Sequence, residues 1–79
     1  MPTVLRVGPY RFFFFSNEGT EPPHIHVESG DGYAKFWLNE VRLARSQGFR
    51  AHDLTNIRRI IEEQEKLFLA KWNEYFGNA

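Results

Sequence analysis

The sequence contains no cysteine and only one methionine among its 79 residues. Without cysteine the chain has no disulfide framework and no thiolate chemistry, which fits the reducing cytosol. Long apolar segments are also absent, since the run Phe12–Phe15 is far too short to span a bilayer. Residues 1–6 lack the charged region and long apolar run of a signal peptide. We therefore expect a soluble, cytoplasmic protein with no membrane association.

An excess of charge of either sign is missing too, because 10 Lys and Arg residues balance 10 Asp and Glu residues. No net field then attracts nucleic acid or an acidic membrane, and binding to RNA or DNA would need a local patch. The length allows one domain, residues 1–79. It divides near Gly48 into a β-rich part, 1–48, and a helical part, 49–79.

The first third of the chain predicts a β-hairpin. Thr3–Val7 and Tyr10–Ser16 are typical of strands, and the pair Gly8-Pro9 between them is typical of a turn. Side chains alternate between the two faces of a strand, so the four phenylalanines make the second strand apolar on both faces. This strand should therefore be central or covered on its second face. The proline and glycine residues of 17–23 predict a loop.

A second hairpin is predicted around Asp31-Gly32, a pair that favours a two-residue type I′ turn. This turn would place Glu28 opposite Lys35 and His26 opposite Trp37. It sorts apolar side chains onto one face and polar or aromatic ones onto the other, and a slip of one residue would destroy this separation. The apolar face would hold Ile25, Val27, Ala34, Phe36 and Leu38, and the other face His24, His26, Glu28, Lys35 and Trp37.

The remaining chain predicts a further strand and a helical segment. Alternation in residues 40–47 favours a strand, with a short helix as the alternative. From residue 51 to 76, apolar residues recur every three or four positions, which predicts one amphipathic helix or two helices joined near Gln64, ending at Gly77. The predicted fold is α+β: a three- or four-stranded antiparallel sheet of two β-hairpins, packed against a C-terminal amphipathic helix that can be kinked near Gln64.

His24 and His26 are the first candidates for chemistry, since their spacing places them on one face of a strand. Two imidazoles with Glu28 could hold a divalent metal, but the sequence offers no second ligand pair and no cysteine. We therefore expect no metal site and no cofactor. The structural alternative is that both imidazoles stabilise the Pro22-Pro23 loop by hydrogen bonds and stack on Trp37.

The same face could bind phosphate or nucleic acid, with Lys35 as a cation and Trp37 or Tyr33 as a ring for base stacking. Arg42 or Arg45 would extend this surface if their strand lies alongside. A metal-independent ribonuclease is one alternative, with an imidazole as acid or base and an ammonium group near the phosphate. Its candidate catalytic residues are His24, His26 and Lys35; the candidate ligand- or partner-binding residues are Arg11, His24, His26, Glu28, Lys35 and Trp37.

A protein interface is the third interpretation of this face, because aromatic residues are enriched in the centres of interfaces. The partner would be a small protein or further copies of the chain. The aromatic helix end, Trp72–Phe76, could form another interface. The structural alternative is favoured there, because Trp and Phe at helical spacing are usually part of the core.

Three segments together resemble the bacterial domain of unknown function 4160 family: residues 11–18, 21–28 and 34–38. The Pro22-Pro23-His24-Ile25-His26-Val27 element carries most of this resemblance, and residues 72–76 also fit. The resemblance implies a compact bacterial protein that is often encoded beside another small protein, of the domain of unknown function 2442 family. Such pairing suggests a two-gene module of the toxin–antitoxin kind. We expect a component that acts by binding a partner protein, with RNA or DNA as a further candidate ligand.

Overall fold

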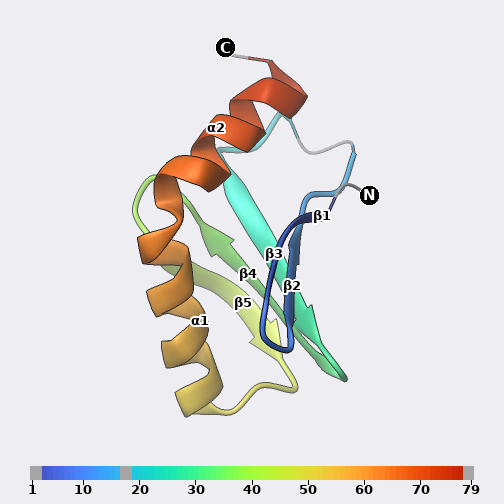
Figure 1. Ribbon diagram of the computed structural model, residues 1–79, viewed down its shortest axis with the longest axis vertical. Helices are drawn as coiled ribbons and strands as arrows, with labels where there is room; N and C mark the ends of the chain where they lie inside the picture. The colour runs from blue at the N-terminus through green and yellow to red at the C-terminus, as the bar shows by residue number, and fades with distance from the viewer. Residues whose placement is uncertain (1–2, 17–18, 78–79) are drawn as a thin grey trace.

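The computed structural model describes residues 3–16 and 19–77, which form a five-stranded antiparallel sheet followed by two helices (Figure 1). Each strand pairs with the one before it in the chain, so the spatial order is the sequence order. The elements are β1 Thr3–Val7, β2 Tyr10–Phe13, β3 His24–Ser29, β4 Gly32–Trp37, β5 Arg42–Gln47, α1 Ala51–Glu63 and α2 Glu65–Phe76.

The first hairpin is confirmed, with Val7 paired with Tyr10 across the two-residue turn Gly8-Pro9. Gly8 has φ +54°, a conformation that only glycine adopts without strain. The second strand is shorter than predicted and ends at Phe13 instead of Ser16. After the end of β2 the rings of Phe14 and Phe15 still pack on different sides: Phe14 against Trp72 and Phe15 against His26.

The predicted register of the second hairpin is wrong by two residues. Ser29 pairs with Gly32, so the turn is centred on Gly30-Asp31. Gly30 has φ +57° while Asp31 does not have a positive φ, which suits a turn with glycine at its first central position and not the type I′ turn. Gly32 lies in β4 instead, where a Cβ atom would be 2.4 Å from the Phe49 ring. A shift of two residues keeps each side chain on its face, so the predicted separation of faces survives.

The predicted strand count of three or four is wrong, because residues 40–47 add β5 to two complete hairpins. The strand interpretation of this segment is confirmed: β5 pairs with β4 along Arg42–Gln47, with an irregularity between Lys35 and Phe36. The helical region is not one helix. It is broken at Gln64, whose N–H is shared between the carbonyl oxygens of Ile60 and Ile61, so the alternative of two helices is confirmed.

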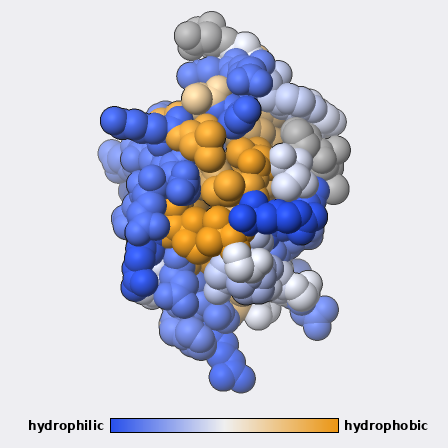
Figure 2. Space-filling model, in the orientation of Figure 1, coloured by the Kyte–Doolittle hydropathy of each residue, from blue (hydrophilic) through white to orange (hydrophobic). Residues whose placement is uncertain are grey.

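Both helices cover one face of the sheet (Figure 1), and the main core lies between these layers. Figure 2 shows that apolar surface remains visible in the middle of this view, with hydrophilic side chains around it. Within the described residues, neither helix is long and apolar enough to cross a membrane. The core consists of Phe12, Phe14, Ile25, Val27, Ala34, Phe36, Leu38, Ile57, Ile61, Phe68 and Trp72.

The observed turn can be tested by substitution at Gly30. Gly30→Ala should lower the free energy of unfolding by about 1 kcal/mol, because a residue with a Cβ is strained at positive φ. Gly30→Asn should cost less, since asparagine tolerates this region better. Urea denaturation measures both values, with Ser29→Ala as the control. If Gly30→Ala were neutral, the turn would not be centred on Gly30-Asp31.

Candidate functional site

The sheet face opposite the main core is formed by three rows of directly paired residues. Direct neighbours on adjacent strands share a face. We call this surface the basic face and define it by its rows. One row runs Arg6, Arg11, Glu28, Tyr33 and Gln47; the next runs Thr3, Phe13, His26, Lys35 and Arg45; the third runs His24, Trp37 and Arg42.

All five Lys and Arg residues of the described strands lie on the basic face, whereas Glu28 is the one acidic residue of these strands. A chain with no net charge therefore has a strongly uneven distribution of charge. Three cations also lie over aromatic rings of the same face. The distances to the ring centroids are 4.4 Å for Arg11 on Phe13, 4.7 Å for Lys35 on Trp37 and 5.5 Å for Arg45 on Tyr33.

Both candidate histidines are buried within this face and are not presented to a partner. Their residues are 0% and 1% exposed, although they lie on the predicted face of β3. His26 stacks on Phe13, meets Phe15 at a ring-centroid distance of 4.5 Å, and its Nδ1 is 2.7 Å from the Tyr33 hydroxyl. The two candidate histidines thus lie on the predicted face of β3 and are covered there by aromatic residues.

His24 bears out the structural alternative. Its Nδ1–H donates to the Pro22 carbonyl oxygen at 2.9 Å, which fixes the end of the loop. Its ring also makes edge contact with Trp37 at 5.7 Å and packs against Trp72 of α2 at 4.9 Å. Among the described residues, no group of three or more His, Cys, Asp or Glu side chains is arranged to hold a metal ion.

Two cations of the basic face form ion pairs, one with a carboxylate of the face itself and one with a carboxylate of the preceding loop. The expected pair between Glu28 and Lys35 is absent because the corrected register places Tyr33 opposite Glu28. Glu28 instead binds Arg11, with 2.6 Å between Oε1 and Nη1. Lys35 binds Glu21 of the loop, with 2.7 Å between Nζ and Oε1. Each of these two cations is thus partly neutralised, by a different carboxylate.

Comparison with known proteins identifies the family of the chain. The model of the family described as Domain of unknown function (DUF4160) matches residues 10–73, which is most of the chain. The chain belongs to this family. No curated protein and no solved structure matches it. The segment shared with DUF4160 runs from the start of β2 into α2 and contains every residue of the basic face except Thr3 and Arg6.

Sequence reasoning placed Arg42 and Arg45 on this surface only on the condition that their strand lies alongside, and β5 meets that condition. It missed Arg6 and Glu21. The turn at Gly8-Pro9 carried the signal for Arg6, because it pairs Arg6 with Arg11. The sequence offers no such signal for Glu21, because strand pairing predicts neighbours only for residues within strands and Glu21 lies in a loop.

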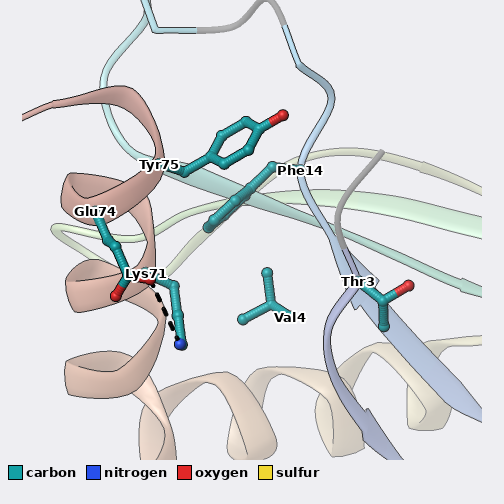
Figure 3. Close-up of a pocket in the computed structure, with 6 residues that line it drawn as sticks. All are labelled: Thr3, Val4, Phe14, Lys71, Glu74 and Tyr75. Atoms are coloured by element: carbon teal, nitrogen blue, oxygen red, sulfur yellow. Dashed lines mark ion pairs between the residues drawn. The ribbon is translucent and has the colours of Figure 1, made fainter.

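A concave feature lies between β1 and α2, and among residues of the basic face it includes Thr3 (Figure 3). It is an open hollow of about 280 Å³, with Val4, Phe14 and Tyr75 among the residues around it. Lys71 and Glu74 form an ion pair at its helical wall, with 3.9 Å between Nζ and Oε1. The aromatic helix end is thus divided: Trp72 belongs to the core, as the structural alternative held, while Tyr75 is 47% exposed.

The structural role of His26 predicts a loss of stability on truncation. His26→Ala should lower the free energy of unfolding by about 2–4 kcal/mol, because it leaves a cavity beside Phe13 and removes a hydrogen bond. Tyr33→Phe should cost about 1 kcal/mol, since the ring contact remains. His52→Ala is the matched control, because that side chain is 72% exposed. Equal stability of all three variants in urea denaturation would contradict a structural role.

Proposed function

We propose that this protein is the binding component of a toxin–antitoxin-like pair and that its basic face docks an acidic surface of a small partner protein. One observation carries the proposal: all strand cations share one face with three aromatic rings. Positive charge placed over aromatic rings suits a site for carboxylates flanked by apolar groups. The class of partner comes from the family resemblance, which implies that such a chain is often encoded beside another small protein.

The residue types of the basic face also suit a protein interface. Trp, Tyr and Arg are the residues that most often dominate binding energy. Trp37 is paired directly with Arg42, and Tyr33 lies further along β4 on the same face, beneath the guanidinium group of Arg45. Trp37 is only partly buried and lines an open hollow with Pro22 and Pro23. An apolar side chain of the partner could enter this hollow while carboxylates bind the surrounding guanidinium groups.

Electrostatics would act mainly on association. Arg42 and Arg45 are exposed, so an acidic partner would feel their field before contact. This attraction is screened over about 8 Å at physiological ionic strength. We therefore expect the affinity to decrease as salt concentration rises.

We expect partner binding to depend on the exposed arginines of β5. The double variant Arg42→Ala/Arg45→Ala should bind the product of the neighbouring gene about tenfold more weakly, which corresponds to about 1.4 kcal/mol. Co-expression followed by calorimetry of the purified pair measures the affinity. Arg59→Ala/Lys66→Ala removes the same charge from exposed positions on the helices and should bind normally.

Three results would count against this proposal. One is the lack of any complex with the neighbouring protein. Another is equal weakening by both double variants, which would show a nonspecific effect of net charge. The third is binding of single-stranded RNA, instead of protein, with the same dependence on Arg42 and Arg45.

The ribonuclease hypothesis fits this geometry less well. A catalytic imidazole must reach the proton that it transfers, and both candidate imidazoles lie beneath other side chains. Purified protein should therefore leave single-stranded RNA uncut over a prolonged incubation. Cleavage that disappears in Lys35→Ala, with the fold intact by circular dichroism, would establish the enzyme instead.

A further inference from the structure

The carboxylate of Glu21 lies on the basic face where an acidic partner would bind. Its Oε1 is 2.7 Å from Lys35 Nζ and 3.7 Å from His24 Nδ1. The same ammonium group lies 4.7 Å from the centroid of the Trp37 ring. A side chain of the protein itself thus shows how a carboxylate is received at this position, beside an ammonium group and an indole.

We propose that Glu21 competes with a carboxylate of the partner for Lys35. The Glu21 carboxylate pairs with Lys35 in the free protein and is displaced when the partner's carboxylate binds to Lys35. This inference rests on the proposed function, because it names the chemical group that Lys35 receives. The inference adds Lys35 as the position where the partner's carboxylate binds, and Glu21 as the residue that regulates access to Lys35.

The exchange requires little rearrangement of the backbone. The residues after Glu21 are fixed, since the Pro22 carbonyl accepts from His24 and the Pro23 carbonyl accepts from the N–H of Leu38. The Glu21 side chain itself is 46% exposed, so it can rotate into solvent while the loop end stays in place. Exchange is then a side-chain movement, which is fast compared with loop opening.

The competition also explains how the site can select its partner. An isolated anion that replaces Glu21 makes one ion pair and breaks another, so it gains little. A partner that also contacts Trp37 and the exposed arginines of β5 gains further contacts along the basic face. Glu21 therefore disfavours simple anions and acts on specificity through competition.

The test uses a fluorescein-labelled octaglutamate peptide as the probe, with fluorescence anisotropy at low ionic strength. Glu21→Gln should bind it about two- to fivefold more tightly than the unmodified chain, the range expected when a partly exposed ion pair no longer competes. Glu40→Gln is the control, because it changes the net charge equally at an exposed position that lines the hollow beside Trp37. Its gain should be smaller.

A double variant separates local competition from the general field. In a Lys35→Gln background, Glu21→Gln should bring no gain beyond that of Glu40→Gln, because the shared ammonium group is gone. Equal gains from Glu21→Gln and Glu40→Gln in the presence of Lys35 would overturn the inference and leave the proposed function intact.

The remaining outcomes bear on the proposed function itself. If neither the unmodified chain nor Glu21→Gln binds the peptide, with both folded by circular dichroism, both proposals fail. A labelled oligodeoxythymidine is tested in parallel. If it binds with the same dependence on Glu21 and Lys35 while the peptide does not, the ligand anion is a phosphate, and the assignment of a carboxylate is overturned.

Discussion

Burial of two imidazoles on the central strand is the constraint on which the candidate site depends. Ring nitrogens in apolar surroundings cost free energy unless they are hydrogen-bonded, so His24 and His26 must be both covered and partnered. The Pro22 carbonyl is hydrogen-bonded to His24. His26 is hydrogen-bonded to the Tyr33 hydroxyl and covered by the Phe15 ring. These contacts hold the chain after β2 against the basic face.

The burial of the two imidazoles also limits where positively charged side chains can lie on the basic face. Because β3 is filled by imidazoles and aliphatic side chains at its first four positions, cations on this face come from the other strands. The segment that covers the imidazoles also places Glu21 beside Lys35. Thus Lys35 and Arg11 are paired within the protein, while Arg42 and Arg45 lie on an exposed edge strand. The face therefore has an internally neutralised part and an exposed cationic part.

Alternation along β3 was sufficient to predict which residues share a face, because the period of a strand is fixed. Alternation was not sufficient to predict the register. The segment Gly30-Asp31-Gly32 allows a turn centred on Asp31-Gly32 or on Gly30-Asp31; the two registers differ by two residues, and both keep each side chain on the same face. In the observed register Gly32 lies in β4 against the Phe49 ring, a contact between separate segments that the pattern within the hairpin does not reveal. Burial of the histidines escaped prediction for the same reason: Phe15 and Pro22 belong to a loop, whose path alternation does not determine.

Rigid support beneath the surface suits the binding role proposed for the basic face. Trp37 contacts both the His24 ring and the Lys35 ammonium group, and the Arg45 guanidinium lies over Tyr33. Side chains that are ordered before a partner arrives lose less conformational entropy on association. A buried imidazole contributes to this order only while it stays covered, whereas a catalytic imidazole must be reached by its substrate. In this fold the two imidazole rings are buried and contact Phe13, Phe15 and Trp37, and so they support the basic face from within.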